Sequence, residues 1–336
     1  MDERRKRHTF TLEKIAALRG LLSDAEMRAE DKACVYATGS FGRNEASAHS
    51  DLDLFIVGRD SIGGVQQERK FRSALRRLDE ICIKADLIHA TKALQIAEFS
   101  GDGEYLGHYS ISELTETLGR REDDVSNTFT ARLLLLLESQ PLIGSSVYSD
   151  VVQEVIYAYW RDYEDHKDDF IPAFLTNDIL RLWRTFCVNY EAGTAREPVE
   201  RKAKGKLKNY KLKHSRMLTC YSAILFLLGR YAVYGTVSPD TALEMANFSP
   251  TKRLEHLLQE QKLNKAHRTI TKLLRQYDKF LGATDVPEKD LIERFSDKGL
   301  SRKYFEEAAG FGNFVAEALS AIGTDRASRF YRLLIV

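Results

Sequence analysis

Hydrophobic and polar positions divide the chain into an N-terminal part with mixed helix and strand patterns and a C-terminal part with helical patterns. Residues 11–30 place apolar side chains at helical spacing, and 65–80 repeat that pattern. Ala33–Thr38 and Leu52–Val57 are short β-type runs that end at glycines. Ile81–His89, an apolar run with alternating positions, predicts a third strand. This order of elements predicts a small sheet backed by helices.

Strand signals become rare beyond about residue 125, and period-3.6 patterns take over. The pattern therefore predicts an α+β protein, with a small mixed β-sheet domain at residues 1–120 and an all-helical domain at 121–336. The predicted C-terminal helices cover residues 125–139, 146–164, 171–191, 206–233, 250–281, 286–296 and 300–321.

Composition excludes several classes of protein. With 43% hydrophobic residues among 336, the chain is able to bury a large core, and disorder is not expected to dominate. Fifty Lys and Arg against forty-nine Asp and Glu give a net charge of +1, so no bulk charge draws the chain to nucleic acid or membrane. One local exception is the stretch 201–216, which holds eight basic residues and no acidic one.

Several features predict a cytoplasmic protein without membrane insertion. The charged start, Met1–His8, is followed by no apolar segment of a secretory signal. The apolar runs Leu133–Leu137 and Ala223–Leu228 are too short to span a bilayer. Four scattered cysteines without a CxxC pair predict buried thiols in a reducing compartment. The apolar run Phe330–Val336 predicts packing against the helical domain or against a second subunit in a homo-oligomer.

The candidate functional residues lie in the loop between the two predicted N-terminal strands and at the strand ends beside it. Gly39 and Ser40 end the first strand, and after ten intervening residues Asp51 and Asp53 alternate with leucines. Period 2 places both carboxylates on one face of the strand, where they repel each other unless a cation joins them. Hard oxygen ligands of this kind suit Mg²⁺ or Mn²⁺. A glycine allows backbone N–H groups to approach phosphate oxygens, and the serine hydroxyl adds a donor.

Asp86 is an isolated carboxylate in the apolar run that predicts the third strand. Burying such a group is costly unless it is paired or bound to metal. If that strand lies beside the second one, Asp86 joins Asp51 and Asp53. Three carboxylates then hold two Mg²⁺ or Mn²⁺ ions, which activate an attacking hydroxyl and neutralise a leaving pyrophosphate. Asp79 is a competing carboxylate for this place.

The pattern Gly39-Ser40, ten residues, Asp51-Leu-Asp53 and a later lone Asp resembles the polymerase-β-type nucleotidyltransferase superfamily. The resemblance implies transfer of an NMP or dNMP from a nucleoside triphosphate such as ATP to a hydroxyl acceptor, with release of pyrophosphate. It further implies that Gly39 and Ser40 hold the triphosphate. Asp51 and Asp53 would ligate both metals, and Asp86 would ligate the catalytic metal and act as the base or orient it.

Within the superfamily, residues 39–45 with Ser50-Asp51 look most like the transferase domain of the PII-protein uridylyltransferases and their stand-alone relatives. Arg43 is interpreted as a loop anchor or a phosphate ligand, and Ser50 as a nucleotide contact. No His-Asp dipeptide of that family's phosphohydrolase domain occurs in the chain. Further similarity to the stand-alone relatives covers 131–142, 177–184 and 206–216.

Three functions remain compatible with the sequence. The first is synthesis of an oligonucleotide signal or polymer, as in bacterial anti-phage defence. It is favoured by four basic residues that are expected to bind the triphosphate or an oligonucleotide backbone: Lys206, Lys211, Lys213 and Arg216. The same basic stretch also fits a solvated helix start. A protein or small-molecule acceptor needs no basic channel, and a catalytically silent nucleotide-binding module is the third reading. In the enzyme readings, the helical domain is expected to close over the nucleotide.

Overall fold

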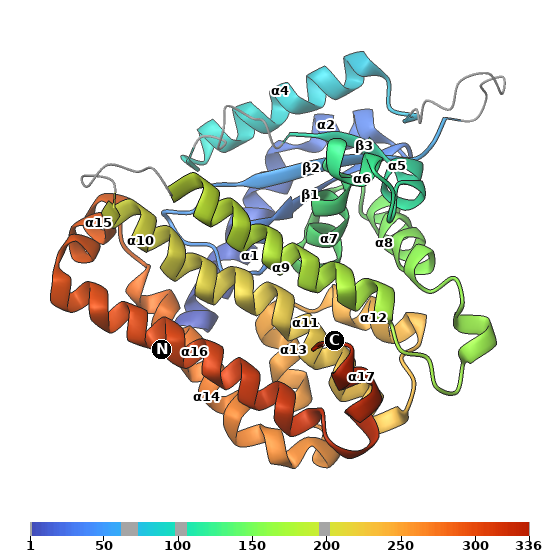
Figure 1. The fold of residues 1–336 in the computed structure, drawn as a ribbon. Coiled ribbons are helices and arrows are strands. Elements are labelled where there is room, and N and C mark those ends of the chain that lie inside the picture. Colours follow the sequence, from blue (N-terminus) through green and yellow to red (C-terminus); the bar gives the residue numbers. More distant parts are fainter. Residues whose placement is uncertain (1, 62–72, 98–105, 195–201, 336) are drawn as a thin grey trace. The chain divides into compact units, whose positions relative to one another are not determined.

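The computed structural model describes residues 2–61, 73–97, 106–194 and 202–335, and the chain forms two compact units (Figure 1). The first unit is Glu3–Arg161 and the second is Asp162–Val336. The first combines a small mixed sheet with helices, and the second is helical, which confirms the expected fold class. The boundary predicted at residue 120 lies inside the first unit.

The first unit is built on a four-stranded sheet in the order β3-β2-β1-β4. β1 pairs antiparallel with β2 and with β4, whereas β2 and β3 are parallel. The two strands predicted around the Gly39–Asp53 loop are therefore adjacent. β4 was not predicted, and its pairing with β1 explains why the first unit extends beyond residue 120. The strands are β1 (Ala33–Thr38), β2 (Asp53–Gly58), β3 (His108–Ser110) and β4 (Gln140–Ile143).

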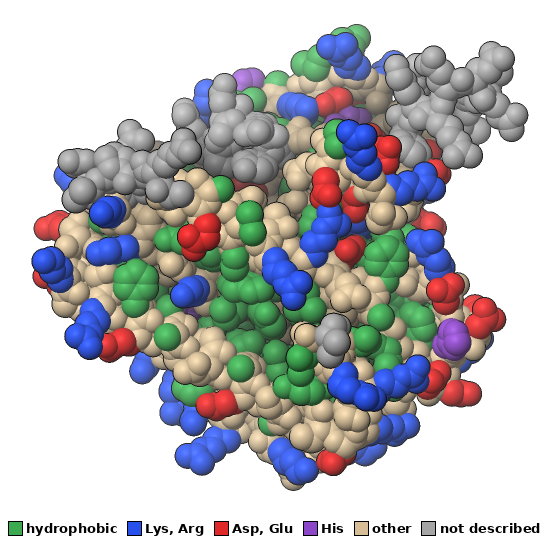
Figure 2. All heavy atoms as spheres, in the orientation of Figure 1, with side chains coloured by type: hydrophobic (Ala, Val, Ile, Leu, Met, Phe, Trp, Pro, Cys, Tyr) green, Lys and Arg blue, Asp and Glu red, His purple; other side chains and the backbone are tan. Residues whose placement is uncertain are grey.

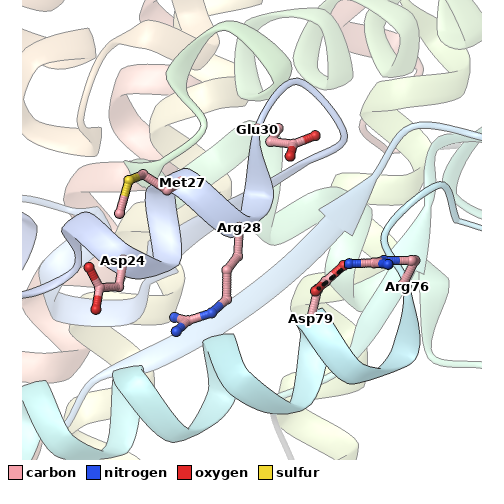
Figure 3. Close-up of a pocket in the computed structure, with 6 residues that line it drawn as sticks. All are labelled: Asp24, Met27, Arg28, Glu30, Arg76 and Asp79. Carbon is pink, nitrogen blue, oxygen red and sulfur yellow. Dashed lines mark hydrogen bonds and ion pairs between the residues drawn. The ribbon is translucent and has the colours of Figure 1, made fainter.

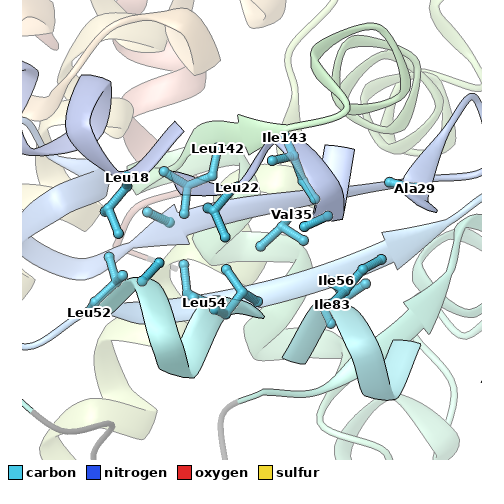
Figure 4. Close-up of a cluster of buried hydrophobic side chains, with 14 of the residues drawn as sticks. Leu18, Leu22, Ala29, Val35, Leu52, Leu54, Ile56, Ile83, Leu142 and Ile143 are labelled. Atoms are coloured by element: carbon cyan, nitrogen blue, oxygen red, sulfur yellow. The ribbon is translucent and has the colours of Figure 1, made fainter. Parts of the chain in front are cut away.

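One face of this sheet carries the hydrophobic core of the unit (Figure 4). Val35 of β1 and Leu54 of β2 are fully or almost fully buried on it. Leu18 from α1, Ala29 from α2 and Ile83 from α4 close the core from the other side. The helices of this unit are α1 (Glu3–Leu21), α2 (Ser23–Ala29), α3 (Gly39–Gly42), α4 (Arg77–Ala93), α5 (Ile111–Glu116), α6 (Glu122–Val125), α7 (Thr128–Glu138) and α8 (Ser145–Tyr159).

The opposite face of the sheet carries aromatic side chains. Tyr36 of β1 stacks on Phe55 of β2 with ring centroids 5.6 Å apart, and Tyr148 of α8 lies 5.9 Å from Tyr36. Side chains alternate along a strand, so Asp53 shares the face of Phe55 rather than that of Leu54. The alternation predicted for Asp53 therefore places its carboxylate on the aromatic face, away from the core formed with α1, α2 and α4.

The strand predicted over residues 81–89 is wrong, because these residues form the middle of α4 (Arg77–Ala93). The buried positions of α4 include Ile83, Leu87 and Ala90, spaced four and three residues apart as on one face of a helix. A strand would have buried Ile81 with Ile83, yet Ile81 is 52% exposed. The first half of the helix predicted over 65–80 lies outside the described residues, and in the second half the chain is helical only from Arg77, where α4 begins.

The second unit packs its helices around one long central helical run. The predicted helices from residue 171 onward are confirmed, with a break between α13 and α14 that the pattern did not show. The helices are α9 (Ala173–Thr194), α10 (Lys202–Lys211), a π-helical segment (Leu212–Arg216), α11 (Met217–Tyr234), α12 (Pro239–Asn247), α13 (Pro250–Leu257), α14 (Asn264–Ala283), α15 (Glu288–Ser296), α16 (Lys298–Ile322) and α17 (Ser328–Arg332).

The run Lys202–Tyr234 is, among the described residues, the one helix long and apolar enough to cross a membrane by length and composition alone. In the structure 72% of its apolar window is buried inside the protein, which is the environment of a core helix. Among the described residues no cysteine forms a disulfide: Cys34 and Cys220 are buried as predicted, whereas Cys82 is exposed and Cys187 half-buried.

His214 lies in the π-helical segment and is fully buried among aromatic rings. Its ring stacks on Phe280 at 4.6 Å, with an angle of 3° between the planes, and its Nδ1 lies 2.9 Å from the Tyr210 carbonyl oxygen. Burial lowers the pKa of His214 from 6.5 to about 4. The unfolded chain therefore takes up a proton below pH 6.5 while the folded chain stays neutral until about pH 4.

We predict that acidification from pH 6.5 to 4.5 lowers the free energy of unfolding through His214, by up to roughly 3 kcal/mol for this one group. Urea unfolding followed by circular dichroism should give a shallower pH dependence for His214→Leu than for the wild type. His166→Leu, at an exposed position, is the control and should keep the wild-type slope. Equal slopes for all three proteins would contradict the prediction.

Candidate functional site

The candidate site begins where β1 ends and the chain makes the single helical turn α3. Gly39, the first residue of α3, has φ +63°, a conformation that side chains with a Cβ rarely adopt. A Cβ built at Gly39 would also lie only 2.9 Å from Asp53 Oδ2. Two constraints therefore require glycine at this position: the backbone conformation of the turn and the close approach of the Asp53 carboxylate to the backbone.

Two buried hydroxyl groups lie beside this carboxylate. Thr38 pairs directly with Asp53 across the β1–β2 ladder, and Ser40 follows Gly39 in α3. Within the described part of the chain, neither Thr38 Oγ1 nor Ser40 Oγ has a hydrogen-bond partner. Buried polar atoms are nearly always hydrogen-bonded, so two orphaned hydroxyls in one place indicate a site for a polar ligand. The sequence pointed to Ser40, whereas Thr38 was missed.

Arg43 anchors the loop that follows α3. Its Nη1 donates a hydrogen bond to Glu138 Oε2 at 2.7 Å, and its Nε pairs with Glu45 Oε1. All three side chains are buried. Gly42 lies so close to this helix end that a Cβ would overlap the Glu138 carbonyl oxygen. Of the two interpretations of Arg43, the structure supports the loop anchor, because its guanidinium is held between two buried carboxylates.

The rest of the loop is held by α1 and by its own turn. Arg7 Nη1 donates to the Glu45 carbonyl oxygen at 3.1 Å, and Ala46 N donates to Thr11 Oγ1 at 2.9 Å. The Ser50 hydroxyl accepts a hydrogen bond from Ser47 N at 3.0 Å and closes the turn before Asp51. Ser50 thus has a structural role in this loop, and its predicted nucleotide contact stays a prediction.

Asp51 and Asp53 are held at one end of β2 by the residue between them. Leu52 is buried in the core of the first unit, Asp51 is exposed and Asp53 is half-buried. Backbone pairing continues through Asp51, which forms a parallel bridge with Ala97. Ala97 is the last described residue before the gap, and Glu98 follows it in the sequence outside the described residues. The spacing of the two aspartates therefore gives a pair at one edge of the sheet.

Asp86 does not join this pair in the structure. It lies on α4 and forms an ion pair with Arg28 of α2. Both helices pack on the core face of the sheet, whereas Asp53 lies on the aromatic face. The placement of Asp86 beside Asp51 and Asp53, which relied on a third strand at 81–89, is therefore wrong. No cluster of three or more His, Cys, Asp or Glu suited to a metal occurs in the described ranges.

A cavity of about 360 Å³ lies between α2 and the start of α4 (Figure 3). Arg76 pairs with Asp79 in this cavity, and Arg28, which points toward α4, pairs with Asp86. The basic side chains of this cavity are thus neutralised by neighbouring acids. It also lies on the face of α2 and α4 rather than at Asp53, so we do not assign the nucleotide to it. Its lining residues are Asp24, Met27, Arg28, Glu30, Arg76 and Asp79.

The predicted basic residues belong to the second unit. Lys206 and Lys211 lie on α10, and Lys213 and Arg216 on the π-helical segment. Arg216 lies over the Phe186 ring at 5.0 Å from its centroid, and Lys206 Nζ donates a hydrogen bond to the Phe295 carbonyl oxygen at 3.5 Å. Binding of the triphosphate by these residues stays a prediction.

The residues around Gly39 fit a metal–nucleotide complex. Mg²⁺ is commonly bound in proteins by one or two carboxylates together with substrate phosphates, and Asp51 and Asp53 supply that number. Orphaned hydroxyls at Thr38 and Ser40 are donors for phosphate oxygens. The Cys34 thiol is an unsuitable nucleophile because burial raises its pKa to about 12. The arrangement therefore suits the binding and transfer of a phosphoryl-type group.

Comparison with known families agrees with this geometry. Residues 18–130 match the model of the nucleotidyltransferase domain, which supports the polymerase-β-type nucleotidyltransferase superfamily. The match contains β1, α3, β2 and α4 and lies within the first unit. No curated protein and no solved structure matches the chain.

We predict that Gly39→Ala lowers both stability and activity. The positive φ costs an L side chain about 1–2 kcal/mol, and the new methyl group would crowd the Asp53 carboxylate. The control is Gly20→Ala in α1, where a Cβ meets nothing within 4 Å. That change should stabilise the helix by up to about 1 kcal/mol. Chemical unfolding of both variants measures the difference, and equal stability of the two would contradict the account of Gly39.

We also predict that Arg43→Met is severely destabilising. Removing the guanidinium from between the buried Glu45 and Glu138 carboxylates should cost about 3–5 kcal/mol. Glu138→Gln in the Arg43→Met background should restore part of this loss. Lys167→Met, which breaks an exposed pair with Glu164, should leave the urea midpoint unchanged. An Arg43→Met midpoint equal to that of Lys167→Met would refute the anchoring role.

Proposed function

Since residues 18–130 match a nucleotidyltransferase domain, we propose that the protein transfers a nucleoside monophosphate from a nucleoside triphosphate to a hydroxyl acceptor. Pyrophosphate is the leaving group of this reaction. The observation that carries the proposal is the cluster at Gly39, in which two orphaned hydroxyls and a carboxylate meet at the end of β1. Residues 1–161, rather than 1–120, would carry the catalytic function.

In this proposal α3 and its flanking residues bind the triphosphate. The first N–H groups of a helical turn have no partner within the turn and are free to face an anion. The hydroxyl groups of Ser40 and Thr38 donate hydrogen bonds to phosphate oxygens. This binding removes the free-energy cost of burying the two hydroxyls without a hydrogen-bond partner. Gly39 keeps the backbone open to the phosphates, because no side chain stands between them and Asp53. Arg43 holds this turn in place through its ion pairs with Glu45 and Glu138 and does not contact the nucleotide.

Asp51 and Asp53 would hold Mg²⁺ or Mn²⁺ together with the triphosphate oxygens. When bound, the metal neutralises negative charge on the transferring phosphoryl group and on pyrophosphate. Because Leu52 anchors this end of β2 in the core, the two aspartates would hold the metal and the triphosphate oxygens at a fixed place beside Gly39. With Asp86 on the other face of the sheet, the described residues supply two carboxylates for the proposed two-ion site.

The acceptor we favour is a hydroxyl of a nucleotide or oligonucleotide. Residues 201–216 carry eight basic residues in a chain of net charge +1, and phosphate-rich acceptors bind such stretches. The product would then be a short oligonucleotide signal or a polymer, for which a role in bacterial anti-phage defence is one setting. Transfer to a protein, as in the uridylyltransferases, is the other outcome of the experiment below.

The test incubates the purified protein with Mg²⁺ and each α-³²P-labelled NTP and dNTP, and separates the products on denaturing gels. A ladder or a discrete small product would support a nucleotide acceptor and name the base. Label that stays with the protein until protease treatment would replace the oligonucleotide acceptor with a protein acceptor. Absence of any product together with absence of nucleotide binding would overturn the proposed function.

We predict that Asp51→Asn and Asp53→Asn each abolish product formation, because each removes a charged metal ligand. Asp86→Asn should retain at least half of the activity, because Asp86 pairs with Arg28 on the opposite face of the sheet. Glu98→Gln tests whether a third carboxylate comes from the sequence next to Ala97, whose backbone pairs with Asp51. Loss of activity in Asp86→Asn with normal folding would contradict the placement of the site.

A further inference from the structure

A cavity of about 480 Å³ lies between α10 and the first half of α16 in the second unit. These helices lie side by side (Figure 1), and Figure 2 shows Lys and Arg side chains gathered at the end of the unit where α10, α15 and α16 meet. We call this cavity the α10–α16 groove. It is lined by Lys206, Lys298, Ser301, Arg302, Phe305, Glu306 and Ala309.

The cations of this groove are largely available to a ligand. Lys298 is exposed and forms no hydrogen bond or ion pair with the described residues. Lys206 makes only a long contact, 3.5 Å from Nζ to a carbonyl oxygen. Arg302 pairs with Glu306, but both side chains are mostly exposed, at 83% and 68%, so water and salt weaken that pair. The groove lining therefore carries three cations against one acid, Glu306.

The positive charge extends along α10 on the side of Lys206. Lys202 precedes Lys206 by four residues, so the two share one face of the helix. Lys204, Lys208 and Lys211 lie on the opposite face, beside Glu288 of α15. Lys202 and Lys206 on α10, like Lys298 and Arg302 on α16, are thus one helical turn apart. Cations that follow two helices in this way suit a polyanion with regularly spaced charges.

The wall contributed by α16 adds an aromatic ring to the groove. Phe305 lies one helical turn from Arg302 and is only half-buried. Lys298, Arg302, Phe305 and Ala309 recur at spacings of four, three and four residues, so they share one face of α16. A positive groove with an exposed aromatic side chain is the combination that binds single-stranded nucleic acid through its phosphates and by base stacking.

We propose that the α10–α16 groove binds single-stranded nucleic acid without sequence preference. Lys206, Lys298 and Arg302 contact the phosphate backbone, and Phe305 stacks on a base. The groove shares Lys206 with the basic stretch from which the nucleotide acceptor is argued, and to that extent this proposal rests on the proposed function. RNA binding requires no nucleotidyl transfer, so the two are measured separately. Every unit of a single-stranded nucleic acid carries both a phosphate and a flat ring, whereas the acidic side chains of a peptide carry no ring, and for that reason nucleic acid is the occupant we commit to.

The test measures fluorescence anisotropy of a fluorescein-labelled 20-nucleotide single-stranded RNA with the full chain at 50, 100 and 200 mM salt. The wild type should bind, and its affinity should fall steeply as salt rises. The Lys206→Ala/Lys298→Ala/Arg302→Ala variant should bind at least tenfold more weakly at 50 mM salt. Its slope of log affinity against log salt should be smaller by about 2, for three lost phosphate contacts on a single strand.

A matched control removes three exposed cations from α14, Lys265, Arg275 and Lys279, with the same change in net charge. It should keep the wild-type affinity. Phe305→Ala should weaken RNA binding severalfold but leave binding of inorganic polyphosphate unchanged. Asp53→Asn should bind RNA as the wild type does, which separates this site from catalysis.

Three outcomes would overturn the proposal. The first is absence of RNA binding at 50 mM salt. The second is an equal loss of affinity in the groove variant and in the α14 control, which would show a diffuse charge effect. The third is equal competition by an acidic peptide of the same charge as the RNA, which would show a surface for acidic proteins.

Discussion

The buried Arg43 guanidinium between Glu45 and Glu138 holds the candidate site together. It joins the loop between β1 and β2 to the end of α7, 95 residues away in the sequence. Breaking one partner of a buried pair is costly because a charge is left in a medium of low polarity. This network ties the loop to α7, and the hydrogen bonds from α1 add to it. α3 thereby keeps the geometry in which Gly39 lies close to Asp53, and the hydroxyls of Thr38 and Ser40 find no partner among the described residues.

The sheet divides the first unit chemically. Its core face takes Leu52 and Leu54 and is covered by α1, α2 and α4, so α4 has no access to the carboxylates on the aromatic face. Asp86, at the outer part of that layer, pairs with Arg28. A site on the other face must draw its ligands from β1, α3 and β2 and from the chain that pairs with Asp51. The face of the sheet therefore decides the role of each carboxylate: Asp53 on the aromatic face is available to the candidate site, whereas Asp86 on the core side forms an ion pair.

Local patterns predicted the parts of the site that are local. Strands β1 and β2, the glycine turn and the aspartate pair all follow from short-range alternation and spacing. The run Ile81–His89 fits both a strand and a helix by sequence, because its apolar residues recur at alternating positions and also at spacings of three and four. Packing of α4 against α1 and α2 decides for the helix. β4 is four residues long and contains Pro141, which an edge strand tolerates but a strand pattern does not indicate. The contact of Arg43 with Glu138 spans too much sequence for any local signal.

The central claim is that the Gly39–Asp53 cluster binds a metal–nucleotide complex. Electron paramagnetic resonance of Mn²⁺, titrated in the presence of a non-hydrolysable ATP analogue, measures this binding without requiring turnover. The account predicts nucleotide-dependent uptake of Mn²⁺ by the wild type and by Asp86→Asn, and loss of that uptake in Asp53→Asn. Equal uptake by Asp53→Asn and the wild type, or loss in Asp86→Asn alone, would contradict it.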